Sequence, residues 1–253
     1  MAELALSMGG LENLTDLDLS HNKDLSGNAK TWASCLKTLT HLRSLEMQDC
    51  GTESRDVKYL AKAISEMGNL MDCNFSGSQV ELDVSSSDSL IRLTIRSGSF
   101  RTGDIGEDMA DILQSLCNRV DLVSLILENI YGLSDSVTLW TPVLSKLTHL
   151  EELELYGCSL QSTDIEHLAV ALSQMPALRE LSLKDNWSLG GSAESWAPSL
   201  EKLRYVRHLN LDNCALTEED MRHIHEVRER CSPWKLSCGL YGLIERSMTH
   251  DWL

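Results

Sequence analysis

The stretch Leu14-Thr-Asp-Leu-Asp-Leu-Ser-His-Asn22 decides the fold, because its pattern, Leu-x-x-Leu-x-Leu-x-x-Asn or Cys, recurs along the chain. The first position of this phrase falls at Leu14, Leu42, Leu70, Leu90, Leu122, Leu150, Leu178 and Val206. Five of the seven steps are 28 residues long, and the other two are 20 and 32 residues. A short internal period of this kind is typical of solenoid proteins, in which each unit packs only on its neighbours.

Each phrase predicts one short strand. Leucines at alternate positions point to one side, whereas polar residues such as Thr15 and Asp18 point to the other. Apolar residues at helical spacing precede the next phrase and predict a return helix: Trp32, Leu36 and Leu39; Leu60, Ile64 and Met67; Leu168, Leu172 and Met175. We therefore predict an α/β solenoid bent into a horseshoe, with parallel strands on the concave face and helices on the convex face.

The repeats predict one domain over residues 1–253. We expect residues 1–13 to form an N-terminal helix or cap, because Leu4, Met8 and Leu11 match the helix positions of the regular repeats. Eight repeats follow over residues 14–231, irregular at 78–121, and residues 232–253 are predicted to form a C-terminal cap. Within the irregular part, Gln79–Ser89 leaves no room for a full return helix. Its alternating valines and leucine predict an extended segment on the convex side.

The last position of the phrase alternates between two kinds of residue, so a double unit of about 56 residues underlies the repeat: Asn22, Cys50, Ser78, Gly98, Ile130, Cys158, Asn186 and Cys214. We call Asn22, Ile130 and Asn186 the Asn-type positions, and Cys50, Cys158 and Cys214 the Cys-type positions. After each Asn-type position, a leucine follows three residues later and a tryptophan ten residues later: Leu25 and Trp32, Leu133 and Trp140, Leu189 and Trp196. Asn or Cys at such a turn can bond backbone groups that would otherwise be buried unpaired. We expect the three tryptophans to fill the core.

Two long repeat types in alternation resemble the ribonuclease-inhibitor-like subfamily of leucine-rich repeats, which is found in ribonuclease inhibitor and in the sensor ends of NOD-like receptors. The resemblance covers residues 4 to about 231, and the matching residues are core residues. Leu-Thr-His-Leu at Leu39 and Leu147 and Trp-Ala-Pro at Trp196 also look like chordate immune receptors built from such repeats, similar in purpose to variable lymphocyte receptors. The shorter repeats and cysteine-paired caps of the lamprey receptors are not visible. The resemblance implies non-catalytic recognition of a protein or microbial ligand in innate immune sensing.

Charge and composition limit the kinds of partner and the location that we expect for this protein. A net charge of −16 disfavours nucleic acid and anionic lipid and favours basic or mixed-charge partners. No run approaches 18 apolar residues, so we predict no membrane span, and the first residues do not resemble a signal peptide. Most of the eight cysteines fall at repeat core positions, which favours a cytoplasmic location, with a secreted protein as the alternative. Cys231 and Cys238 could close a disulfide, but buried thiols are the favoured interpretation.

Sequence motifs for catalysis or cofactor binding are absent, and we predict neither an enzyme nor a cofactor. Arg101–Asp108 superficially suggests a calcium or phosphate loop, but it is better explained as a turn into a helix, with Asp104 or Glu107 as the cap. His223 and His225 lack a third ligand at a suitable spacing, so no metal site is predicted.

The candidate binding residues are outward strand residues that the repeat does not need. Four apolar ones are expected on three neighbouring strands, beside two arginines and next to an acidic strand. An exposed apolar patch with arginines and a charged surround is typical of an interface centre. The candidate ligand- or partner-binding residues are Met71, Ile91, Arg92, Arg96, Val123, Ile126, Glu152, Glu154 and Tyr156.

Three alternatives to ligand recognition at this patch remain. The patch could be simple repeat decay with tolerated apolar residues. The chain could be a stoichiometric inhibitor or scaffold that wraps a basic protein through Glu151, Glu152, Glu154, Asp16 and Asp18. The patch could also form a homodimer.

Overall fold

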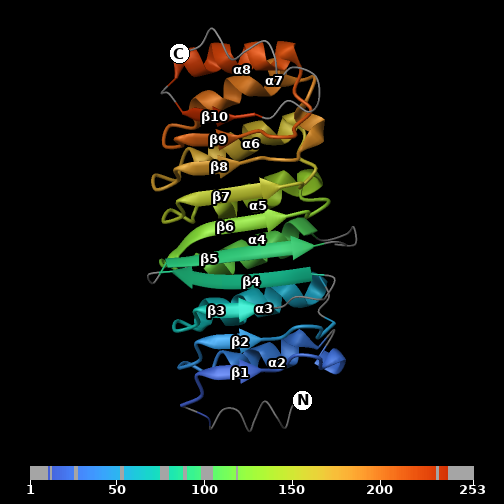
Figure 1. Ribbon diagram of the computed structural model, residues 1–253, viewed down its shortest axis with the longest axis vertical. Coiled ribbons are helices and arrows are strands. Elements are labelled where there is room, and N and C mark those ends of the chain that lie inside the picture. Colours follow the sequence, from blue (N-terminus) through green and yellow to red (C-terminus); the bar gives the residue numbers. More distant parts are fainter. Residues whose placement is uncertain are drawn as a thin grey trace.

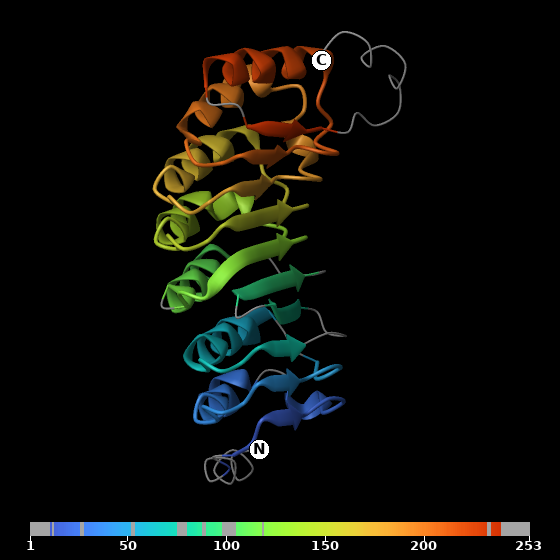
Figure 2. The same cartoon turned by 60° about the vertical axis from the view of Figure 1, so that its left-hand side comes forward.

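The computed structural model describes residue 11 and residues 13–25, 28–51, 54–74, 80–87, 90–97, 105–117, 119–231 and 234–238. In these residues the strands form one ten-stranded sheet in the order β1 to β10, and helices cover one of its faces (Figure 1). The stack of coils follows a shallow curve with the helices on its outer side (Figure 2). None of the helices described is long and apolar enough to cross a membrane.

Short strands alternate with helices or turns. The strands are β1 (Asp16–Asp18), β2 (Ser44–Glu46), β3 (Asp72–Asn74), β4 (Val80–Ser87), β5 (Leu90–Ser97), β6 (Leu122–Glu128), β7 (Glu152–Tyr156), β8 (Glu180–Ser182), β9 (His208–Asn210) and β10 (Lys235–Ser237). The α-helices are α2 (Ala29–Leu36), α3 (Ser54–Glu66), α4 (Ile105–Leu116), α5 (Val137–Leu144), α6 (Ser162–Leu172), α7 (Ala193–Trp196) and α8 (Glu218–Arg230). Four 3-10 helices complete the described elements: η1 (Lys23–Leu25), η2 (Ser134–Ser136), η3 (Trp187–Leu189) and η4 (Ala197–Lys202).

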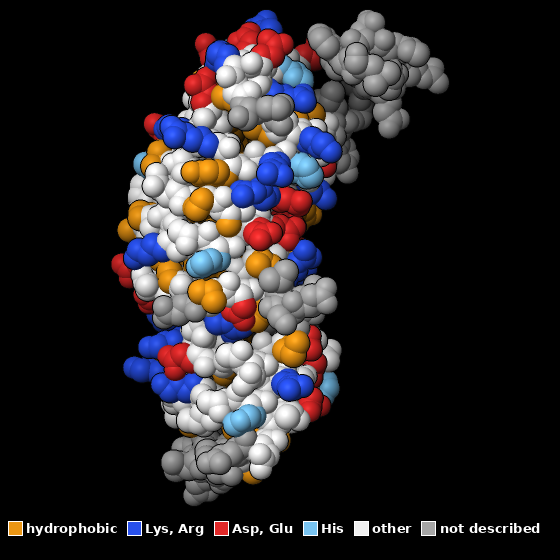
Figure 3. Space-filling model, turned by 90° about the vertical axis from the view of Figure 1, so that its left-hand side faces the viewer, with side chains coloured by type: hydrophobic (Ala, Val, Ile, Leu, Met, Phe, Trp, Pro, Cys, Tyr) orange, Lys and Arg blue, Asp and Glu red, His pale blue; other side chains and the backbone are white. Residues whose placement is uncertain are grey.

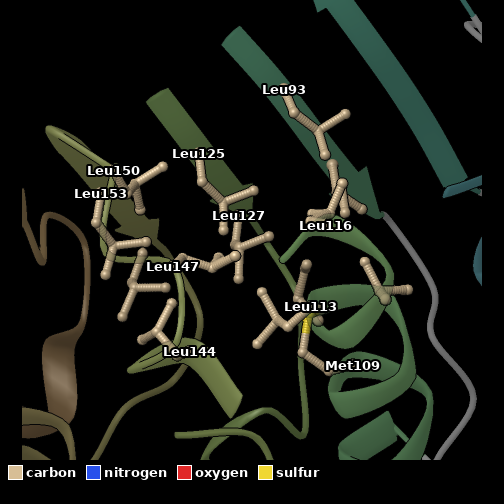
Figure 4. Packing of buried hydrophobic residues seen from close by; sticks show 14 of the residues in the cluster. Leu93, Met109, Leu113, Leu116, Leu125, Leu127, Leu144, Leu147, Leu150 and Leu153 are labelled. Carbon is tan, nitrogen blue, oxygen red and sulfur yellow. The ribbon is translucent and has the colours of Figure 1, made fainter. Parts of the chain in front are cut away.

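The core is an aliphatic layer between the sheet and the helices. Leu14, Leu17 and Leu19 of the first coil are partly buried, and the predicted inward leucines and apolar helix positions of the later coils are buried where their burial is described, which confirms the strand and helix interpretation of the repeat. Figure 4 shows strand and helix residues of this layer in contact, among them Leu93, Leu125, Leu127 and Leu153 from the sheet and Met109, Leu113, Leu116 and Leu144 from the helices. Burial of each such side chain contributes about 1.5–3 kcal/mol, so the ladder is the main source of stability.

The Asn and Cys positions bond the backbone of the preceding coil, as expected. Asn186 is fully buried; its side-chain amide donates to the carbonyl oxygens of Leu155 and Leu183, both at 2.7 Å, and its oxygen accepts from the amide of Leu160 at 3.0 Å. The thiol of Cys158 donates to the carbonyl oxygen of Leu127 at 3.3 Å, and Cys50 and Cys214 make the equivalent bonds. Burial raises the pKa of Cys158 to about 12, so this thiol stays protonated and structural.

Each of the three core tryptophans bonds to the leucine seven residues before it, which explains the fixed spacing of these two residues in the repeat. The indole N–H of Trp196 donates to the carbonyl oxygen of Leu189 at 3.0 Å, and Trp32 and Trp140 donate in the same way to Leu25 and Leu133. All three indoles are at most 3% exposed. Because each indole satisfies a carbonyl of its own coil, the tryptophan closes the Asn-type turn as well as filling space.

The segment between β3 and β5 departs from the prediction. Residues 80–87 are extended, as expected, but they lie in the sheet and not on the convex side. There β4 pairs antiparallel with both β3 and β5, whereas every other pair in the sheet is parallel. A parallel return needs a crossover of a dozen or more residues, but five residues separate β3 from β4 and two separate β4 from β5, so both connections are too short for parallel pairing. Insertion into the sheet also pairs backbone groups that an isolated convex segment would leave without partners.

The two ends of the solenoid differ in what is described. The predicted N-terminal helix over residues 1–13 lies almost wholly outside the described residues. At the other end, Trp234 is 1% exposed, and β10 pairs in parallel with β9. The phrase that begins at Trp234 therefore adds one further strand, although it does not continue as a regular repeat.

Cys231 and Cys238 are free thiols, but both are only partly buried, whereas the favoured interpretation was buried thiols. Burial raises the pKa of both above the ordinary thiol value.

Candidate functional site

Strand pairing places six of the predicted site residues in three rows across β5, β6 and β7, together with Ser124, Thr94 and Glu128. The first row is Arg92, Ser124 and Glu152; the second is Thr94, Ile126 and Glu154; the third is Arg96, Glu128 and Tyr156. Paired residues of neighbouring strands point to the same side of a sheet, and these rows face away from the helices. We call the nine residues the sheet-face site.

The first row is held by an ion pair that crosses a strand. Arg92 on β5 donates through Nη2 to Oε2 of Glu152 on β7 at 2.9 Å, and the same oxygen accepts from the hydroxyl of Ser124 at 2.5 Å. Ser124 is 3% exposed, so it forms a polar floor beneath the pair. The arginine is therefore oriented along the sheet, although an exposed pair of this kind adds at most about 1 kcal/mol to stability.

The third row joins an ion pair to an aromatic ring. Arg96 donates through Nε to Oε2 of Glu128 at 2.6 Å. The ammonium of Lys184 lies 5.3 Å from the centre of the Tyr156 ring, within cation–π range. A hydrogen bond from the Tyr156 hydroxyl to Asp185, with burial next in size, raises the pKa of the phenol. The charges of Arg96 and Glu128 in this row are therefore paired, and Tyr156 adds a neutral phenol.

The middle row contains the apolar centre and an unmatched acid. Ile126 is half-buried between Thr94 and Glu154. Burial, and then the neighbouring charge of Glu152, raises the pKa of Glu154 above its ordinary value, and Arg92 opposes this only in part. Glu154 is thus a carboxyl whose ionised form the folded protein disfavours.

Replacement of Glu154 by Gln should stabilise the protein at neutral pH and not in acid. A carboxyl with a raised folded-state pKa carries no penalty below its unfolded-state pKa of about 4.3, and the penalty grows as the pH rises through the folded-state pKa. We expect a small rise in Tm for Glu154→Gln at pH 7 and no rise at about pH 4. Thermal unfolding at both values checks this, with the exposed Glu151→Gln as the matched control. A lower Tm for Glu154→Gln at pH 7 would contradict the electrostatic picture.

Ile91 was predicted to face outward, and this is wrong. Its side chain is 6% exposed and belongs to the core. Ile91 pairs with Leu122 and Arg92 with Ser124, so the extra residue at this register shift is Val123 on β6. Along β5 the sides alternate regularly, so Ile91 lies on the inner side with the buried Leu93 and Ile95, and Arg92 lies on the outer side.

Met71 does not belong to the same cluster. It is 39% exposed, as predicted, but it precedes β3, and β4 lies between β3 and β5. The apolar part of the sheet-face site is therefore limited to Ile126, and the partly exposed Val123 lies near it on β6. The structure brings together Arg92, Arg96, Glu152, Glu154 and Tyr156 as expected.

Two exposed aromatic residues beside this site were missed. Tyr131 and Trp187 are 50% and 61% exposed and follow the strand ends of β6 and β8. Both come one residue after an Asn-type position, at Ile130 and Asn186. The sequence signal for both is a large aromatic residue at a repeat position that the core does not use, outside the strands.

The residues considered as metal ligands in the sequence are described in part. Among the described residues, no group of three or more His, Cys, Asp or Glu side chains could hold a metal ion. Met109, Ile112 and Leu116 on α4 are buried, so this helix packs as predicted, while residues 98–104 of the preceding turn lie outside the described part. His225 is exposed on α8, and His223 lies 3.3 Å from Glu219.

Comparisons with known proteins find distant structural similarity. No family model matches the chain. Similar solved structures include the leucine-rich repeat-containing protein LegL7 from Legionella pneumophila, with a TM-score of 0.39 and 14% identity over 92% of this chain and 85% of that one. The yeast Rad7–Elc1 complex gives 0.29 and 15% over 92% and 65%, and the TLR13–ssRNA13 complex gives 0.39 and 16% over 93% and 34%.

These matches are too distant to assign a function. The chain spans about a third of the TLR13 chain and just under two thirds of the yeast one. The assignment of a leucine-rich-repeat fold therefore rests on the chain's own coils: the recurring phrase, the stacked strands and the buried leucine ladder.

Proposed function

We propose that this protein is a non-catalytic recognition module that binds a protein or microbial-surface ligand through the sheet-face site. The observation that carries the proposal is the arrangement around Ile126. A partly buried apolar residue lies between two rows in which Arg92 and Arg96 are oriented by carboxylates. Interface centres combine apolar contact with pre-oriented arginine in this way. Because the arginine side chains are already held in place, binding costs less conformational entropy.

We further propose that the chain is of the ribonuclease-inhibitor-like type and acts in innate immune sensing. The alternation of Asn-type and Cys-type coils supports the subfamily, because Asn186 and Cys158 make equivalent bonds to the preceding coil. The setting in immune sensing rests on the resemblance of sequence alone.

Replacement of Ile126 by Arg should weaken ligand binding at least tenfold and leave the Tm nearly unchanged. The new cation would displace the apolar contact and repel Arg92 and Arg96. The matched control is Val170→Arg, because Val170 is 50% exposed on α6 on the opposite side of the molecule. Proteins retained from a cell extract by the two immobilised variants and the wild type are compared by quantitative mass spectrometry. An identical set on all three would contradict the proposal.

A second candidate function is the wrapping of a basic protein by the acidic surface. The unmatched Glu154, together with the net charge of −16, favours this alternative. Salt separates the two, because the Debye length falls from about 30 Å at 0.01 M to about 8 Å at 0.15 M. Binding that collapses over this range indicates electrostatic wrapping, whereas binding that persists and depends on Ile126 indicates recognition at the sheet-face site. Sedimentation of the isolated chain tests the homodimer.

A further inference from the structure

Residues on the rim where the parallel strands end alternate between large and small. The residue after each of three Cys-type positions has a positive φ: Gly51 at 68°, Ser159 at 56° and Ala215 at 52°. This left-handed backbone region is unfavourable for bulky side chains. The corresponding residues after Asn-type positions are Lys23, Tyr131 and Trp187, none of which has a positive φ. The double repeat therefore produces gaps between large rim residues.

One of these gaps has an aromatic residue on both sides. Ser159, which is exposed, lies between Tyr131 and Trp187, one coil away from each. Backbone bonds from the amide of Asn129 to Tyr156 at 2.8 Å and from Gly157 to Lys184 at 3.0 Å hold these three coils directly against one another. At a strand spacing of 4.7–4.9 Å, the two aromatic residues are attached about 10 Å apart, which leaves room for one side chain. We call Tyr131, Ser159 and Trp187 the rim notch.

The surroundings of the rim notch favour a cation. Glu128 and Asp185 lie at or after the strand ends of these coils, and Asp212 follows β9 in the next coil, against the two cations Lys184 and, on β5, Arg96. Arg96 is already paired with Glu128. Lys184 lies over the ring of Tyr156, so the protein itself places a cation on an aromatic face beside the notch.

The opposite rim, where the parallel strands begin, differs from the rim notch in how its exposed apolar residues are distributed. Figure 3 shows that rim, on which hydrophobic side chains are scattered among polar ones. Its exposed Val120 and Tyr205, at 65% and 41%, are three coils apart. Single exposed apolar residues are ordinary on protein surfaces. Two large aromatic residues that flank one small residue form a group and are not isolated in this way.

We propose that the rim notch binds an arginine side chain presented by a loop of a protein partner. A guanidinium is planar, so it can stack on an aromatic ring while its N–H groups bond a neighbouring carboxylate such as Asp185. The inference rests on the proposed recognition function and specifies the chemistry of one group that is recognised. The rim notch adjoins Tyr156 of the sheet-face site, so one partner can contact both.

The test uses the peptide acetyl-Gly-Arg-Gly-amide and its neutral isostere with citrulline in place of arginine. Binding is followed on the full chain by the indole N–H resonances in nitrogen-15 NMR spectra, with Trp187 identified by its absence from Trp187→Phe. We expect the arginine peptide to shift the Trp187 resonance saturably and the citrulline peptide to bind about fivefold more weakly or not at all. Tyr131→Ala should weaken binding of the arginine peptide by a similar factor.

Two controls separate this inference from the proposed function. Leu139→Ala removes an exposed apolar residue of α5 and should leave peptide binding unchanged. Ile126→Arg should also leave it unchanged, although that variant loses the larger ligand. Equal shifts with both peptides, no saturable shift, or full binding by Tyr131→Ala would overturn the arginine site while recognition at the sheet-face site could still stand.

Discussion

Trp196→Ala should lower the free energy of unfolding by about 3–5 kcal/mol. The indole is 1% exposed and lies at the end of α7, where it fills the space between neighbouring coils. Its removal leaves a cavity and takes the N–H donor away from the carbonyl of Leu189. In a solenoid each coil packs only on its neighbours, so distant parts of the chain cannot compensate for the cavity. Denaturant unfolding measured by circular dichroism checks the value.

Two further variants show which part of the tryptophan matters. Trp196→Phe keeps most of the volume and loses the donor, so we expect a cost of about 1–3 kcal/mol. Trp187→Ala removes an indole that is 61% exposed and should change stability by less than about 0.5 kcal/mol. Similar losses for Trp196→Ala and Trp187→Ala would mean that the inward and outward positions of the repeat are wrongly assigned.

Asn186→Ala should cost about 3 kcal/mol or more. The substitution removes the side-chain partner of two buried backbone groups, the carbonyl of Leu155 and the amide of Leu160, and leaves the carbonyl of Leu183 with the thiol of Cys214 as its side-chain donor. Each such group costs about 1–3 kcal/mol when it is unsatisfied. The control is Asn22→Ala, because Asn22 is exposed near the start of the described chain and should lose less than about 1 kcal/mol.

The alternation of the repeat makes Asn186→Cys an informative companion. Cysteine donates to a leucine carbonyl of the preceding coil at Cys158 and Cys214, but a thiol is a poor acceptor for the amide of Leu160. We expect Asn186→Cys to retain part of the stability that Asn186→Ala loses. Equal losses for Ala and Cys at this position would show that Asn and Cys are not interchangeable in the ladder.

Most of the coil architecture was predictable because the repeat encodes it locally. The spacing of Leu60, Ile64 and Met67 predicted one face of α3, and all three are buried. The pairing of leucine and tryptophan at Asn-type turns pointed to a core role, and the indole bonds to Leu133 and Leu189 supply the reason. Each of these features depends on contacts within one coil or between adjacent coils, which a periodic sequence repeats.

The candidate site was predictable only in part. Arg92, Glu152 and Glu154 were expected to lie near one another, because regular repeats align equivalent positions of successive strands. Ile91 was misplaced because the phrase places both Ile91 and Arg92 outward, whereas β5 alternates sides regularly from Ile91 onward and aligns Ile91 with Leu122. Met71 was misplaced because β4 enters the sheet, so sequence neighbours in the repeat are not neighbours in space.

The recurring phrase that begins at Leu14 thus established the solenoid, the inward ladder and the alternation of Asn-type and Cys-type turns, because each is a local consequence of which residues can be buried or bonded within a coil. Its interruption between Leu70 and Leu122 was also visible in the sequence. The path of the chain through that interruption depended on hydrogen bonds between strands that do not follow the repeat. The ion pairs that orient Arg92 and Arg96 also depended on contacts between different strands. Those bonds form only when the coils stack, and they set which residues the sheet presents to a partner.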